Sequence, residues 1–161
     1  MTRSRTVAPC FVLVLAAVTG ISSVSVAALI AFPAAQQAGV TPATVWDAVY
    51  TEEQAKRGKD LFGATCAACH GESLDGLESA PPLTGVQFNA NWDGTTLGDL
   101  GERIRISMPA DKPGSMSRPQ LADVIAYLLK VDNFPAGDKP LDPQTAALMQ
   151  IRFESIRPQP K

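Results

Sequence analysis

The stretch Cys66-Ala67-Ala68-Cys69-His70 decides how this chain folds and what it holds. Two thiols three positions apart, followed at once by a histidine, have the spacing at which c-type haem is attached. At such a site the thiols bond to the vinyl groups of one porphyrin, and the adjoining imidazole becomes an axial ligand of the iron. The stretch therefore predicts one covalently attached haem c, held by Cys66 and Cys69, with His70 bound to the iron.

Two other chemistries use similar cysteine spacings. A structural zinc site usually has four protein ligands, but the chain has only one further cysteine, Cys10 in the N-terminal apolar run, and no second histidine. A thioredoxin-like dithiol accompanies alternating strands and helices, and the chain has no convincing run of alternating β-branched residues. These residues favour haem attachment, and a redox dithiol is the alternative.

The first 27 residues have the layout of an export signal. Arg3 and Arg5 precede an uncharged apolar stretch over residues 11–32, as in a secretory signal with a basic start. The small residues Ser25-Val26-Ala27 favour cleavage beside them, but about 20 apolar residues could also remain as a membrane anchor. We therefore predict a periplasmic location, with membrane attachment only if the segment is not cleaved.

The charge of the chain bears on its partners. The whole chain has 14 basic and 16 acidic residues; without Arg3 and Arg5 the mature chain has 12 against 16, a formal charge of −4. It contains no basic run with interleaved aromatic residues, so a nucleic acid is not expected as a partner. An acidic surface suits a protein that docks on a basic patch of a redox partner.

Helix signals lie on both sides of the haem motif. Thr51 with Gln54, and Ser117 with Gln120, have the form of capping boxes. They predict helices running from Thr51 toward Cys66 and from Ser117 to about Lys130, and apolar spacing predicts another over residues 96–107. Residues 71–91 are rich in Gly, Pro, Ser and Asn, which predicts a loop around the haem edge.

These signals divide the chain into four parts. Residues 1–27 are the signal peptide or anchor, residues 28–45 a flexible lead-in, residues 46–132 the haem domain, and residues 133–161 an extended C-terminal tail. Around Thr145 to Ile151 the tail shows the periodicity of a short helix. Its apolar residues imply that part of it packs on the domain or on a partner. Those residues are Leu141, Leu148, Met149, Ile151 and Phe153.

The second axial ligand of the iron must come from a residue other than histidine. Outside the targeting segment the candidates are Met108, Met116 and Met149. Met116 directly precedes the helix cap Ser117, which gives it a structural role in a hydrophobic staple. Met108 lies where a helix breaks into a proline-containing loop, and we predict that it is the second metal ligand. Met116 is the alternative, and Met149 is expected to pack in the tail.

Residues 45–131 resemble the class I c-type cytochromes with a single haem. The resemblance rests on Gly58 and Phe62, the haem motif, Pro81-Pro82-Leu83-Thr84-Gly85, Met108-Pro109 and Ala126-Tyr127-Leu128. It implies a small all-α fold around one haem, with the first and last helices crossing at Gly58 against Tyr127 or Leu128. It also implies that the Pro81 carbonyl accepts a hydrogen bond from the second nitrogen of His70.

Other side chains could meet the haem propionates. Trp92 could donate its indole N–H, although core packing is an equal alternative. Arg103 and Arg105 could also pair with propionates, and their alternative is a solvated helix surface.

The predicted function is one-electron transfer without conversion of a substrate, so the chain is not expected to be an enzyme. The tail and Trp46-Asp47-Ala48-Val49-Tyr50 look similar to segments of cytochromes that accompany periplasmic dehydrogenases. That resemblance implies a dehydrogenase as electron donor, an oxidase or another cytochrome as acceptor, and a place as a subunit of a dehydrogenase complex. The alternative is a peroxidase-like haem enzyme or small-ligand sensor with a labile sixth ligand, for which the chain lacks a second histidine.

Overall fold

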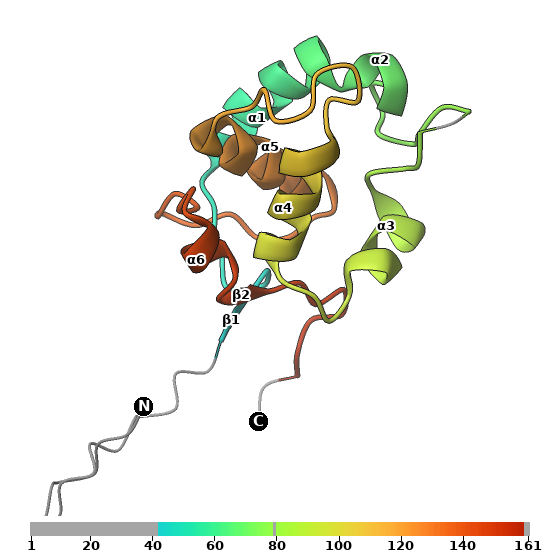
Figure 1. Cartoon of the computed structure of the whole chain (residues 1–161). Helices are drawn as coiled ribbons and strands as arrows, with labels where there is room; N and C mark the ends of the chain where they lie inside the picture. Colours follow the sequence, from blue (N-terminus) through green and yellow to red (C-terminus); the bar gives the residue numbers. More distant parts are fainter. Residues whose placement is uncertain (1–41, 79, 160–161) are drawn as a thin grey trace, which may run out of the picture. The chain divides into compact units, whose positions relative to one another are not determined.

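The computed structural model describes residues 42–78 and 80–159, so the predicted signal segment 1–27 lies outside the described residues. Helices predominate, as Figure 1 shows, which confirms the predicted all-α class. The elements are β1 (Ala43–Thr44), α1 (Glu52–Thr65), α2 (Ala67–His70), α3 (Gly85–Trp92), α4 (Leu97–Ser107), α5 (Arg118–Val131), α6 (Thr145–Leu148) and β2 (Ile151–Arg152).

The crossing of α1 and α5 forms the centre of the fold. A Cβ atom on Gly58 would lie only 1.8 Å from the carbonyl oxygen of Asp123 and 2.9 Å from Cβ of Tyr127. Only glycine therefore allows the two helices to come this close. The rings of Phe62 and Tyr127 lie 5.5 Å apart beside the crossing. The predicted contact of Gly58 with Tyr127 is confirmed, and Asp123 contributes the closest atom.

The helix caps follow the sequence signals with one instructive difference. Ser117 and Gln120 form the complete capping box at α5, and Thr96 forms one with Asp99 at α4. At α1 the Thr51 side chain accepts from the backbone N–H of Gln54, but the Gln54 side chain turns inward. There its amide group bonds both the N–H and the carbonyl of Leu141, at 2.6 and 3.1 Å.

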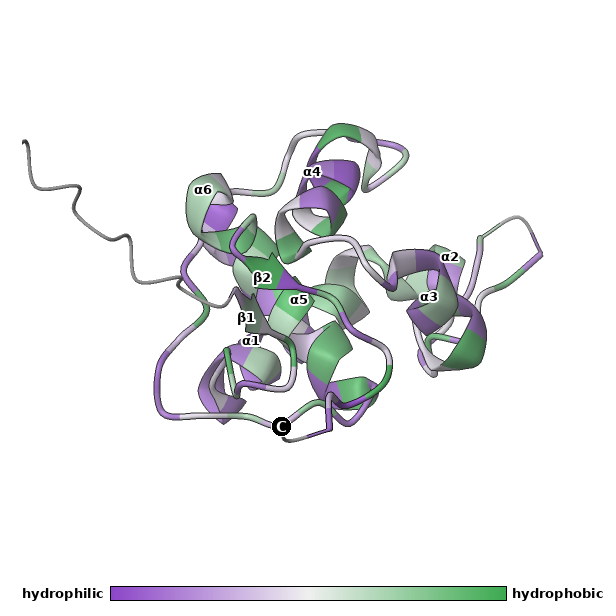
Figure 2. Ribbon diagram, turned by 90° about the horizontal axis from the view of Figure 1, so that it is seen from below, coloured by the Kyte–Doolittle hydropathy of each residue, from purple (hydrophilic) through white to green (hydrophobic). Residues whose placement is uncertain are grey.

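The loop predicted over residues 71–91 is only partly a loop, because its second half forms α3. Phe88 anchors this helix: its ring is buried and lies 6.0 Å from that of Phe153. Both Figure 1 and Figure 2 show α3 on the same side of the fold as α2.

The C-terminal strap, residues 133–159, is part of the core rather than a separate tail. Phe134, Leu141, Leu148 and Phe153 are all buried in it. β2 pairs in parallel with β1, with Ala43 opposite Ile151. The predicted helix near Thr145 is confirmed as α6. Because Ala43-Thr44 form a strand and Val45 is buried, residues just before the predicted domain start at Trp46 are part of the folded domain.

The apolar residues collect along α5, which is buried over most of its length. Figure 2 shows α5 as largely hydrophobic and α4 as a mixture of hydrophobic and hydrophilic residues. Among residues 42–78 and 80–159, no helix has the length and apolar character that crossing a membrane requires.

Candidate functional site

The two thiols and His70 lie within one helical turn. Cys66 separates α1 from α2, and its carbonyl accepts from the backbone N–H groups of Cys69 and His70, at 3.1 and 3.0 Å. Both cysteines are free thiols; Cys66 is half-buried and Cys69 is exposed. Burial raises the pKa of the Cys66 thiol, against the lowering effect of a hydrogen bond with Thr65. This turn presents two unpaired sulfur atoms beside one imidazole.

The imidazole of His70 is held in a fixed orientation. Its side chain is buried, and Nδ1 lies 2.9 Å from the carbonyl oxygen of Pro81. A carbonyl can only accept, so Nδ1 carries a proton, and in the neutral form of the ring Nε2 keeps a lone pair. Such a bond orients a metal-ligating histidine and makes it a stronger electron donor. The Pro81 contact that the resemblance implied is present.

The loop between His70 and Pro81 is closed by backbone contacts. Gly76 donates its N–H to the His70 carbonyl, at 3.0 Å, and Leu83 donates to Leu74, at 2.8 Å. Gly76 has φ of +80°, and a Cβ there would lie 2.5 Å from the carbonyl oxygen of Ala80. A side chain at this position would push the 80–82 segment away from His70.

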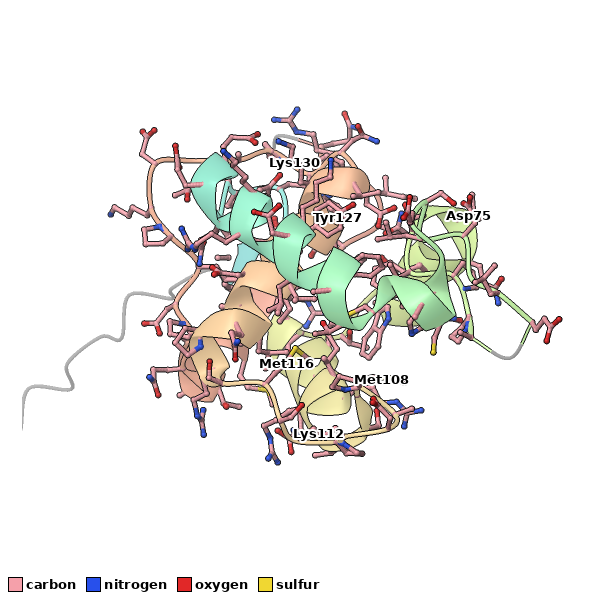
Figure 3. All side chains as sticks on the ribbon, turned by 90° about the horizontal axis from the view of Figure 1, so that it is seen from above. Asp75, Met108, Lys112, Met116, Tyr127 and Lys130 are labelled. Carbon is pink, nitrogen blue, oxygen red and sulfur yellow. The ribbon has the colours of Figure 1, made fainter. Side chains whose placement is uncertain are left out.

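The three methionines differ in their surroundings. Met108 is the residue after α4, where the backbone becomes extended, and its side chain is half-buried. Met116 is also half-buried, and Figure 3 shows both on the same side of α1. Met149 packs on Gly98, and its sulfur accepts from the Thr96 hydroxyl at 3.3 Å. The packing role predicted for Met149 is thus present, whereas Met108 remains the predicted ligand.

Two of the three residues considered for the propionates have other partners in the protein. The guanidinium of Arg105 makes two hydrogen bonds with Glu102, at 2.8 and 2.6 Å, on an exposed face of α4. Arg103 is exposed on the same helix. Trp92 packs partly buried against the core, 6.4 Å from the Phe88 ring. Surface charge and packing describe these three residues, and a contact with the propionates stays a prediction.

Sequence reasoning missed Asp132, which links α5 to α3. Its Oδ1 accepts from the Thr84 hydroxyl, the Gly85 N–H and the Asn89 side-chain amide. A signal was present in the sequence, because a carboxylate at the C-terminal end of a helix opposes the helix dipole. An acidic residue in that position needs a partner elsewhere.

The residues of this site fit a c-type haem. The thiols have no disulfide partner, and the hydrogen bond from Nδ1 leaves the lone pair of Nε2 available for iron. The apolar side chains of Phe62 and Leu74, close to these residues in sequence, are buried. Thiols for covalent attachment and an imidazole for the iron are the donor set that haem c uses.

A comparison with protein-family models agrees with this geometry. Residues 53–128, just under half of the chain, match the family described as "Cytochrome C oxidase, cbb3-type, subunit III". This match supports the predicted class I c-type cytochrome domain over these residues, with a haem that transfers electrons.

A solved structure is similar to this chain, and no curated protein matches it. The similar structure is the sulfane dehydrogenase SoxCD from Paracoccus pantotrophus, with a TM-score of 0.46 and 23% sequence identity. The alignment covers 67% of this chain and 61% of the SoxCD chain.

Proposed function

We propose that this cytochrome is a periplasmic one-electron carrier with a single haem whose iron is bound by His70 and Met108. In this proposal it takes electrons from a periplasmic dehydrogenase and passes them toward the respiratory chain. When bound, the haem supplies an iron that alternates between the ferric and ferrous states. Everything else is the work of the chain, which attaches the haem, fixes the ligands and presents a surface to its partners.

The His70–Pro81 hydrogen bond is the observation that carries the proposal. The imidazole is buried, and the bond holds it in one orientation with a proton on Nδ1. A ligand that does not have to reorient when the iron changes charge suits an electron carrier, because fixed dipoles lower the cost of reorganisation. Cys66 and Cys69 lie within the same turn, so attachment and ligation depend on one local structure.

The end of α4 supports Met108 as the second ligand. The Met108 N–H still bonds the Ile104 carbonyl, at 2.8 Å, while its own backbone is already extended. The backbone of Met108 is therefore fixed by the end of α4, although Met108 itself no longer has helical geometry. A thioether ligand favours ferrous iron and raises the reduction potential, which suits a carrier that accepts electrons.

The partners in this proposal rest on charge and on resemblance. The mature chain is acidic, so a basic patch on the donor would favour encounter. The segment around Trp46 is bound to the C-terminal strap, because the indole N–H of Trp46 donates to the Glu154 carbonyl, at 2.8 Å. We expect the outer surfaces of these segments, rather than their buried faces, to meet a dehydrogenase.

Intact-mass spectrometry of the mature protein tests attachment and export together. We expect the mass of a chain without its first 27 residues plus one haem. Cys66→Ala and Cys69→Ala should each reduce covalent attachment, and Cys10→Ala is the matched control that should leave it unchanged. A mature protein without haem, or with haem retained after both Cys66 and Cys69 are replaced, would contradict the proposal.

The donor is tested by reduction kinetics. The oxidised protein is mixed with a purified periplasmic dehydrogenase and that enzyme's substrate, and the appearance of the ferrous spectrum is followed. We expect rapid reduction that slows as salt is raised, because the attraction between the proteins is screened. Reduction no faster than by substrate alone would contradict the choice of that donor.

A further inference from the structure

Asp132 reaches from the end of α5 to the start of α3. Its Oδ1 accepts three hydrogen bonds, from Thr84 Oγ1 at 3.0 Å, from the Gly85 N–H at 2.7 Å and from Asn89 Nδ2 at 3.1 Å. All three donors belong to α3 or to the residue before it. All three bonds therefore join Asp132 to the start of α3, although 40 or more positions separate it from each donor in sequence.

The carboxylate takes the place of a local helix cap. Thr84 precedes α3 with extended backbone, as a cap residue does, yet its side chain makes no capping bond within the helix. Its hydroxyl donates to Asp132 instead, and the first N–H of the helix does the same. A negative charge at the N-terminus of a helix is stabilised by the helix dipole and by unsatisfied N–H groups.

This arrangement has a cost in solvation. Asp132 Oδ2 and Asn89 Oδ1 are buried, and neither has a hydrogen-bond partner among the described residues. Burial raises the pKa of Asp132, and the three bonds to Oδ1 act in the opposite direction. A buried acceptor without a donor carries an unfavourable desolvation free energy. Stability alone does not explain a carboxylate here, because an isosteric amide would avoid part of this cost.

The start of α3 lies close in sequence to Pro81, the residue that holds the proposed haem ligand His70. Pro81, whose carbonyl accepts from His70 Nδ1 at 2.9 Å, lies three residues before Thr84. Between them, the Leu83 N–H is bound to the Leu74 carbonyl. The 81–85 segment is thus held at one end by His70 and at the other by Asp132.

We propose that Asp132 is a positioning residue for the haem centre, which anchors the 81–85 segment so that the Pro81 carbonyl stays bonded to His70. This inference rests on the proposed ligation by His70. Loss of the anchor lets the segment move, which weakens the bond to Nδ1. The imidazole then donates less strongly to iron, ferric iron is less stabilised, and the reduction potential rises.

Four variants separate anchoring from charge. Asp132→Ala removes the acceptor. Asp132→Asn keeps one acceptor oxygen and replaces the unpartnered Oδ2 with an amide NH2 group. Thr84→Val removes one of the three donors. Asp138→Asn, on an exposed part of the strap, is the control for the loss of one negative charge.

The readouts are the reduction potential, hydrogen exchange of the Gly85 amide, and exchange of the His70 Nδ1 proton. We expect Asp132→Ala to raise the potential and to speed both exchanges. Thr84→Val should cause smaller changes in the same directions, and Asp132→Asn and Asp138→Asn should remain close to the wild type.

Two results would overturn the inference. In one, Asp132→Ala leaves the potential and both exchange rates unchanged; in the other, Asp132→Asn raises the potential as far as Asp132→Ala does, so that charge alone acts. If Asp132→Ala fails to fold, the comparison of Thr84→Val with Asp132→Asn decides by the same criteria. Failure of the haem assignment would be distinct, because the wild-type protein would then carry no haem and the two exchange rates would still report the anchoring.

Discussion

His70 shows how the place of one residue in the sequence and its contacts determine its orientation. It follows Cys69 directly, so the thiols and the imidazole share one turn of backbone. Its burial and its bond to Pro81 fix the ring. The same bond sets the proton on Nδ1, which leaves Nε2 as the nitrogen available to iron.

Tyr50 makes the stability of the protein depend on pH in alkaline solution. Burial, with a smaller effect of Glu52, raises the pKa of Tyr50 from 10.0 to about 12. The unfolded chain therefore loses this proton at a lower pH than the folded chain does. The contribution of Tyr50 is complete below about pH 10 and is lost as the pH rises toward about 12.

Urea unfolding across this pH range checks the prediction. We expect the free energy of unfolding of the wild type to fall more steeply than that of Tyr50→Phe. The variant also lacks the hydrogen bond from the Tyr50 hydroxyl to the Phe134 carbonyl, so its stability at neutral pH should be lower by about 1 kcal/mol. Equal slopes for the two proteins would contradict the role assigned to Tyr50.

At residue scale, the sequence was sufficient where the signal was local. Cys66, Cys69 and His70 form a contiguous motif, and Thr51 and Ser117 mark helix starts by their own side chains. Gln54 could not be assigned correctly, because its side chain serves Leu141, which lies 87 positions away. Asp132 was missed for the same reason, since each of its partners lies far away in sequence.

At the scale of elements, α1 and α5 depend on one close approach. The Cβ of an alanine at position 58 would overlap the Asp123 carbonyl, which belongs to the backbone of α5 and cannot turn aside. We expect Gly58→Ala to lower the free energy of unfolding by about 3 kcal/mol. Chemical denaturation measures the effect.

Gly63 on the same helix provides the matched control. It is exposed, and a Cβ there would meet nothing within 4 Å. Gly63→Ala should therefore stabilise the protein by about 0.5–1 kcal/mol, which is the gain in helix propensity. Similar losses in both variants would contradict the explanation by close approach.

The helix α3 shows why one element escaped prediction. Its sequence contains Gly, Val, Phe, Trp and two Asn residues, all of which are modest or poor helix formers. Its cap comes from Asp132 rather than from a neighbouring residue. Local propensity therefore indicated a loop, and contacts from the end of α5 and from Phe153 determine the helix.

At the scale of the whole molecule, the C-terminal strap completes the core. Phe153 is fully buried, with the rings of Phe134 and Phe88 at 5.4 and 6.0 Å. We expect Phe153→Ala to cost about 3–5 kcal/mol in the free energy of unfolding. Ile156→Ala, at a side chain that is 80% exposed, should change it by less than about 0.5 kcal/mol.

Denaturation of the two strap variants distinguishes a core segment from an appended tail. If Phe153→Ala is as stable as Ile156→Ala, the strap does not contribute to the core as described. The sequence indicated only that the strap's apolar residues must pack somewhere. Its pairing with β1 joins positions 43 and 151, and such long-range register has no local sequence signal.

The optical spectrum of the oxidised protein tests the central claim most directly, because a weak far-red band reports methionine bound to ferric haem. We predict that the band is present in the wild type, is lost in Met108→Ala, and persists in Met116→Ala and Met149→Ala. A wild-type spectrum without the band would contradict the proposed His/Met carrier. A band that persists in Met108→Ala but disappears in Met116→Ala would contradict the ligand assignment.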